Sequence, residues 1–239
     1  MVFCGMVAWC AAASPGLCFG QAAGHDMRMQ PHAAASRSVV DSTKEEADKR
    51  FSEFNHRFAG TFILLLGLLA LLEPALAERA PSVRYLWAVF FFIPGLYLLF
   101  FSDPESWPLG SQTLSYVMTR NREVLQHKTF SLLLLGLAVV EFLRVQRRLS
   151  GVWAAALFPV LAGAGALLLL LHSPQAHAAS AHEAMRKIEH QHLEFAAAGL
   201  GAILAKAVAE LGNFHPRWMR RIFAGLLSLL GVLLLLYTE

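Results

Sequence analysis

Long apolar runs alternate with shorter polar segments along this chain from residue 58 onward. A helix needs about 20 consecutive, predominantly apolar residues to cross the hydrocarbon core of a bilayer. Six segments reach or approach that length: 58–76, 83–101, 129–145, 152–171, 193–211 and 222–237. The third reaches it only by including Glu141 near its end. The pattern therefore predicts an all-α fold, a polytopic bundle of six transmembrane helices.

Helical segments are also expected outside the membrane. Thr43 and Glu46 have the spacing of a capping box, and aromatic side chains follow them at helical intervals. A helix is therefore expected to begin near residue 44 and to run into the first span. Residues 181–191 likewise have the pattern of a helix that leads into the fifth span.

The composition is that of a membrane protein, whose expected partner is the lipid bilayer. Hydrophobic residues make up 56% of the 239 residues and charged residues only 15%, whereas soluble domains average about 25% charged residues. No phosphate-binding loop, dinucleotide fingerprint or zinc-finger spacing is present. The net charge of +3 is too small and too dispersed for a nucleic-acid partner. No nucleophile and base form a catalytic pattern, so we do not expect an enzyme.

The chain divides into three segments in this interpretation. Residues 1–22 are weakly hydrophobic and place small residues around a possible cleavage after Ala22, which is typical of a secretory signal peptide. All three cysteines lie there, so cleavage would leave no thiol for a disulfide or a metal. Residues 23–43 are expected to form a flexible tail and residues 44–239 the six-helix domain. The alternative for the first segment is an uncleaved membrane helix.

Arginine placement predicts the orientation. Three short connections have arginines within them or beside them: 77–82, 146–151 and 212–221. Three longer segments mix acidic and basic residues: 23–57, 102–128 and 172–192. The positive-inside rule weighs short loops and helix ends, which places the short connections in the cytoplasm. A protein of the bacterial inner membrane is therefore expected, with both mature termini and the helical extensions in the periplasm.

Nine of the ten histidines fall on this predicted periplasmic side. Four of them mark the start or end of a predicted span: His56, His127, His172 and His192. Imidazole is the commonest protein ligand for borderline metals, and three or four such nitrogens can form a transition-metal site. The four histidines are therefore predicted to bind a metal or haem together. The alternative is that amphipathic imidazoles simply lie at the headgroup level.

Other side chains on this face could assist. His190 and His192 point about 200° apart on a helix, so His190 is expected to face away from the bundle. Asp103 and Glu105 could supply oxygen ligands but are interpreted as loop structure. Auxiliary metal ligands, each an imidazole or a thioether, are expected among His25, Met27, Met29, His32, His177, His182, Met185 and His190.

Glu141, Lys206 and Glu210 are charged residues within the predicted spans, in the half opposite the histidines. Lys206 and Glu210 fall on the helix face of His192, and Glu141 lies near the face of His127. Charges within the membrane usually face the bundle interior and pair. An ion pair, either Glu141–Lys206 or Lys206–Glu210, is therefore predicted. A structural role is favoured, and an ion or proton path is the alternative.

Four short motifs resemble bacterial copper-resistance and copper-homeostasis membrane proteins of the copper resistance protein D type. They are Asn55-His56-Arg57, Gln126-His127-Lys128, His172 with His177, and His190 with His192. The resemblance covers most of residues 50–211. It implies copper handling at the periplasmic face, by import or by delivery to a periplasmic copper carrier. This chain departs from the type by having fewer spans and a histidine-rich segment at 172–192.

Three functional hypotheses follow. The first is a copper-binding or copper-translocating membrane protein that uses the four histidines. The second is a b-type haem electron carrier with two histidines as axial ligands. The third is a structural subunit of a larger membrane complex. A visible spectrum and a metal assay of the purified protein would separate them.

Overall fold

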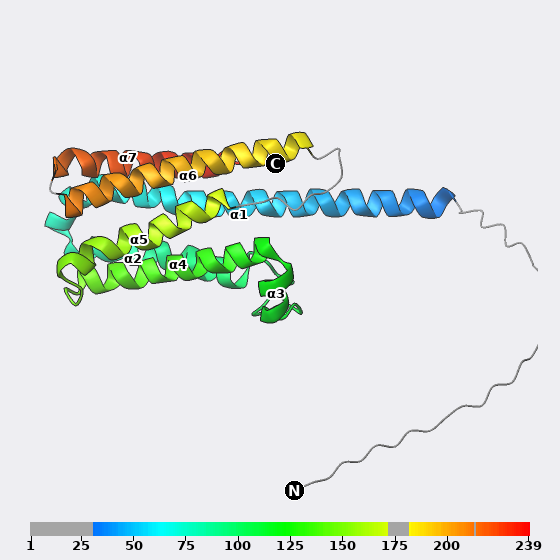
Figure 1. Ribbon diagram of the computed structural model, residues 1–239, viewed down its shortest axis with the longest axis horizontal. Coiled ribbons are helices and arrows are strands. Elements are labelled where there is room, and N and C mark those ends of the chain that lie inside the picture. Colours follow the sequence, from blue (N-terminus) through cyan, green and yellow to red (C-terminus); the bar gives the residue numbers. More distant parts are fainter. Residues whose placement is uncertain (1–30, 172–181, 213) are drawn as a thin grey trace, which may run out of the picture. The chain divides into compact units, whose positions relative to one another are not determined.

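Figure 1 shows the computed structural model, which describes residues 31–171, 182–212 and 214–239. Every regular element in these ranges is a helix, so the predicted all-α class is confirmed there. The elements in chain order are α1 (Pro31–Arg79), the 3-10 helix η1 (Pro81–Tyr85), α2 (Leu86–Phe100), α3 (Leu114–Arg120), α4 (Arg122–Val145), α5 (Gly151–Leu170), α6 (His182–Leu211) and α7 (Pro216–Leu235).

Residues 44–239 form one compact unit. Helix α1 begins at Pro31, earlier than the expected start near residue 44, so residues 31–43 are helical. Alanine is the strongest helix former, and Ala33, Ala34 and Ala35 begin two residues after the proline. The predicted signal peptide, residues 1–22, lies outside the described residues.

Five helices of the described ranges are long and apolar enough to cross a membrane, where six were predicted. They are the apolar part of α1, the segment Pro81–Phe100, α5, the segment Met185–Leu211 of α6, and α7. The third predicted segment, 129–145, is helical within α4. Helix α4 also carries Lys128, Glu141 and Arg144, and these charges shorten its apolar stretch. The chain is thus a multi-pass membrane protein with five clear candidate spans.

Within residues 44–239 the helices pack side by side (Figure 1). Helix α2 packs against α4, α4 against α5, α5 against α6, and α6 against α7. Helix α1 contacts α2 through Phe62 and Phe90, whose ring centroids lie 6.2 Å apart. A buried core joins Leu66 of α1, Phe91 of α2 and Phe158 of α5. The exposed sides of the helices remain apolar, as lipid-facing surfaces must be.

Helices α1 and α7 approach most closely where both carry small residues. A Cβ atom on Gly231 would lie 2.5 Å from the backbone nitrogen of Leu64. A Cβ atom on Gly67 would lie 2.6 Å from the backbone nitrogen of Ser228. Backbones of two helices can come this near only where side chains are absent or small. The two helices are therefore in direct backbone contact along this seam.

Candidate functional site

His56 of α1 and His192 of α6 lie together at one end of the bundle. Their ring centroids are 5.7 Å apart and the ring planes are nearly perpendicular, at 89°. The Nδ1 atom of His56 lies 2.9 Å from the carbonyl oxygen of Ser52, and that of His192 lies 2.8 Å from the carbonyl oxygen of Ile188. A carbonyl only accepts, so each Nδ1 carries a proton and the lone pair of the neutral ring is on Nε2. Metal-binding histidines are oriented in this way.

Two aromatic side chains enclose the histidine pair. Tyr237, just beyond α7, stacks on His56 with a centroid distance of 3.8 Å and an interplanar angle of 23°. It meets His192 edge-on, at 6.0 Å. Phe195 of α6 lies 5.6 Å from His192 and 6.4 Å from His56. Tyr237 and Phe195 are each 1% exposed. These two buried aromatic side chains border the histidine pair and form what we call its aromatic wall.

The segment that carries Tyr237 is held to both histidine-bearing helices. The Gln191 side chain exchanges two hydrogen bonds with the backbone of Thr238: its Nε2 donates at 2.9 Å and its Oε1 accepts at 3.2 Å. Glu239 accepts hydrogen bonds from Ser52 and Lys49 of α1. The Tyr237 hydroxyl donates to the Glu239 carboxylate at 2.9 Å. The aromatic wall is therefore fixed by its own polar contacts.

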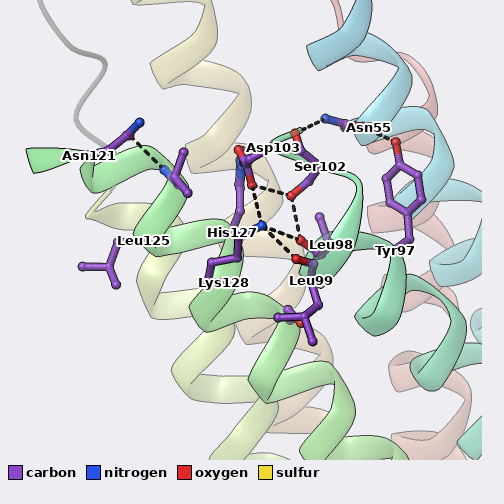
Figure 2. Close-up of polar contacts among 12 residues, drawn as sticks. Asn55, Tyr97, Leu98, Leu99, Ser102, Asp103, Asn121, Leu125, His127 and Lys128 are labelled. Carbon is purple, nitrogen blue, oxygen red and sulfur yellow. Dashed lines mark hydrogen bonds and ion pairs between the residues drawn. The ribbon is translucent and has the colours of Figure 1, made fainter. Parts of the chain in front are cut away.

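A second polar cluster joins α2, α4 and the loop between α2 and α3 (Figure 2). The Nδ1 atom of His127 donates to Asp103 at 2.9 Å, and the Lys128 ammonium lies 3.3 Å from the other carboxylate oxygen of Asp103. Lys128 also donates to the backbone carbonyl of Leu99, at 2.9 Å. This carbonyl belongs to the last turn of α2, where carbonyls lack helical partners and a cation is stabilising. Lys128, 5% exposed, therefore caps α2 from α4.

The two clusters are connected through α1. Asn55, next to His56, donates to the carbonyl of Ser102 at 3.4 Å and accepts from the Tyr97 hydroxyl at 2.6 Å (Figure 2). The Ser102 hydroxyl in turn donates to Asp103 at 2.5 Å. Helix α1 therefore contacts both the histidine pair and the cluster around Asp103.

The Asp103–His127 contact shifts the pKa of both side chains. Burial alone lowers the pKa of His127, but the hydrogen bond and negative charge of Asp103, helped by Glu123 and opposed by Lys128, raise the pKa overall. Burial alone raises the pKa of Asp103, but the hydrogen bond and charge of His127, with Ser102 and Lys128, lower it overall. Both shifts favour the imidazolium–carboxylate pair over its neutral forms.

We expect this pair to make stability depend on pH. The contribution of His127 is fully present below its unfolded pKa, about 6.5, and is lost as pH rises through its higher folded value. That of Asp103 is present above about pH 3.9 and is lost as pH falls through its lower folded value. In detergent, the difference in melting temperature between the wild type and His127→Gln should therefore shrink as pH rises above about 6.5. The exposed His190→Gln is the control, and parallel curves for wild type and His127→Gln would contradict the expectation.

The structure brings together two of the four predicted metal ligands. His56 and His192 are neighbours, whereas the described contact of His127 is with Asp103. His172 lies outside the described residues. In the ranges that the structure describes, no group of three or more His, Cys, Asp or Glu side chains is placed to hold a metal ion.

The predicted auxiliary ligands are only partly described. His190 faces away from His192, with its side chain 70% exposed and 3.3 Å from Glu194. Met185 is half-buried. The remaining predicted auxiliaries either lie outside the described residues or have undescribed side chains: His25, Met27, Met29, His32, His177 and His182.

A third polar cluster lies at the opposite end of the bundle. Lys206 pairs with Glu210 of the same helix at 2.8 Å, which is one of the two predicted pairs. Arg144 of α4 joins Glu210 to Glu141, at 3.0 and 2.9 Å. The Lys206 ammonium also lies 5.7, 4.5 and 5.1 Å from the ring centroids of three aromatic residues: Trp87, Phe158 and Phe223. This cluster of four charges and three rings connects α2, α4, α5, α6 and α7.

Sequence reasoning missed several members of these sites, among them Tyr237 and Asp103. Tyr237 ends the last apolar run and has no spacing relation to His56, 181 positions earlier, so no local signal identifies it. Asp103 was interpreted as loop structure, and its only signal was its position directly after a span, on the predicted face of the histidines. No protein-family model, curated protein or solved structure matches the chain.

Proposed function

We propose that this membrane protein binds copper through His56 and His192 and handles it, by import or by delivery, at the periplasmic face. The observation that carries the proposal is the pair itself. Two imidazoles from separate helices lie 5.7 Å apart between ring centroids, and each is oriented by a bond from Nδ1 to a carbonyl oxygen.

The geometry of the pair suits a shared metal. A metal–imidazole nitrogen bond is about 2 Å long, so two rings on one ion have centroids roughly 6 Å apart. The Nδ1 bonds leave the lone pair on Nε2, the nitrogen that would ligate. His192 is only 6% exposed and His56 is half-buried, so a metal bound by both would be partly shielded from water. Imidazole suits copper as well as zinc, nickel and iron, and the resemblance to copper-resistance proteins favours copper.

Topology is part of the same proposal. We place the histidine pair in the periplasm because the short arginine-rich connections lie at the other end of the helices. The proposal further includes a cleaved signal peptide, α4 as a sixth span, and a periplasmic copper carrier as the partner. Cysteine labelling from either side of the membrane, with single cysteines at Ser115 and Arg147, would test the orientation.

Loss of either histidine is expected to weaken copper binding by about 10- to 100-fold or more, since even changes to the partners of metal ligands have effects of this size. His56→Phe and His192→Phe keep the ring packing against Tyr237 and Phe195 but remove the ligating nitrogen. His190→Phe is the matched control, because its imidazole is exposed two residues from His192. Copper is measured by elemental analysis of detergent-purified protein after equilibration with a competing chelator.

The same preparations separate the other hypotheses. A Soret band lost in both His56→Phe and His192→Phe would replace copper by a b-type haem. A protein with neither copper nor a Soret band would be a structural subunit. Equal copper content in the wild type and both histidine variants would refute the assigned ligands.

A further inference from the structure

We propose that residues 107–122, which we call the α3 segment, lie in the lipid headgroup layer of the membrane and contact lipid through their exposed side chains. The segment follows α2 and the loop around Asp103, and it includes the whole of α3 and the first residue of α4. The proposal does not depend on copper binding. The partner that it assigns to this surface is the bilayer itself.

The α3 segment exposes a concentration of apolar side chains. Five of the twelve residues 107–118 are large hydrophobic residues that are each at least 39% exposed: Trp107, Leu109, Leu114, Tyr116 and Met118. Within α3 only Val117 is buried, where the helix packs on α4. Single exposed hydrophobic residues are ordinary on a soluble surface, but a concentration of them marks a contact with a membrane or another protein.

The level of the segment along the bundle favours the membrane. Helix α2 ends the candidate span Pro81–Phe100, and the Lys128 ammonium binds the carbonyl of Leu99 in its last turn. Lys128 therefore lies where α2 leaves the hydrocarbon. Arg122, the first residue of α4, comes six positions before Lys128, which is about 9 Å along the helix. The headgroup layer on each side of a bilayer is about 5–8 Å thick, so the segment between α2 and α4 lies at the height of that layer.

Described contacts hold the segment down at this level. The loop before α3 is closed by its own backbone, since Trp107 donates to Gln112 at 2.9 Å and Gln112 donates to Glu105 at 3.0 Å. Asp103, just before this loop, lies 3.3 Å from the Lys128 ammonium. Figure 1 shows α3 beside the end of α4 and not in line with the long helices. The segment therefore stays at the end of the bundle and does not extend away from it into water.

The types of exposed side chain match the headgroup layer. Tryptophan and tyrosine are enriched there because each combines an apolar ring with a polar group. Arg120, in the last turn of α3, and Arg122 are both exposed, and neither pairs with an acidic side chain in the ranges that the structure describes. Arginine binds phosphate through paired hydrogen bonds, so the lipid phosphates supply the acceptors that the protein does not.

Depth measurements on the full chain test the proposal. In a chain whose three native cysteines are replaced by serine, a single cysteine at Leu109 or Met118 carries a small fluorophore. The protein is reconstituted into vesicles of phosphatidylcholine and phosphatidylglycerol. Fluorescence is quenched in turn by iodide in the water, by a nitroxide on the lipid headgroup and by a nitroxide deep in the acyl chains. Labels at the exposed Glu46, in the polar part of α1, and at the exposed Leu204, inside a candidate span, are the controls for water and hydrocarbon.

We expect the labels at Leu109 and Met118 to be quenched most by the headgroup nitroxide and several-fold less by iodide than the label at Glu46. Iodide quenching equal to that at Glu46 overturns the proposal, because the segment is then in water. Deep quenching equal to that at Leu204 overturns it as well. Protection from all three quenchers also overturns it and shows that a second copy of the chain or another protein covers the surface. Each label replaces an exposed side chain, so the reading does not require a destabilising variant.

Discussion

Gly231→Leu is expected to destabilise the folded bundle by about 3 kcal/mol or more, the upper part of the range for side chains forced into a filled core. Even the first added carbon would lie 2.5 Å from the backbone nitrogen of Leu64 and 2.7 Å from its Cα atom. Backbone atoms cannot rotate away as a side chain can, so α1 and α7 must separate. The expected readout is a large loss of melting temperature, or of folded yield, in detergent.

Gly225→Leu is the matched control for this prediction. Gly225 is on the same helix, and a Cβ atom there would meet nothing within 4 Å. The change in hydrophobicity and helix propensity is therefore the same in both variants, and only the contact with α1 differs. Equal stability of the two variants would show that α1 and α7 do not pack as closely as described.

Glu210→Leu is expected to destabilise the protein by about 1–3 kcal/mol, because it removes the shared acceptor of two charge-assisted hydrogen bonds in a half-buried cluster. Lys206 and Arg144 both bind the Glu210 carboxylate, at 2.8 and 3.0 Å. Without it, two cations share Glu141 alone. Glu189→Leu on the same helix is the control, because Glu189 is exposed. Chemical or thermal unfolding in detergent measures both.

A second substitution makes this prediction sharper. Lys206→Met together with Glu210→Leu removes the pair as a unit, and apolar replacement of a whole buried pair is often neutral. The double variant should therefore be more stable than Glu210→Leu alone, a coupling that a double-mutant cycle measures. If the double variant is no more stable, the two residues do not depend on each other. If Lys206→Met alone lowers the stability of the protein but keeps transport, a proton or ion path through Lys206 is excluded.

The fold was largely predictable because bilayer spanning imposes a length on each apolar run. The predicted fourth span, 152–171, is α5 within one residue at each end, since the polar ends of such a run fix where the helix begins and ends. The start of α1 at Pro31 was not predicted, because the alanines after Pro31 have helix propensity but no periodicity. The predicted third span, within α4, contains or adjoins the charged residues Lys128, Glu141 and Arg144, which shorten its apolar stretch.

The site was predictable only in part, because its contacts join residues far apart in the chain. His56 and His192 were both expected as ligands from their positions at span ends, and those positions bring them to one level. Which of the four histidines meet depends on helix order around the bundle, which hydrophobic periodicity does not determine. Asp103 meets His127 across 24 positions, and such a contact has no local pattern.

The cluster around Lys206 has an electrical consequence for a membrane protein. When all four groups are ionised, Glu141 and Glu210 balance Arg144 and Lys206. A membrane potential does work of about 2.3 kcal/mol per elementary charge per 100 mV, but only on net charge that moves. A shift of this neutral cluster as one body would therefore be insensitive to voltage. Any voltage dependence of this protein would have to come from charges outside the cluster.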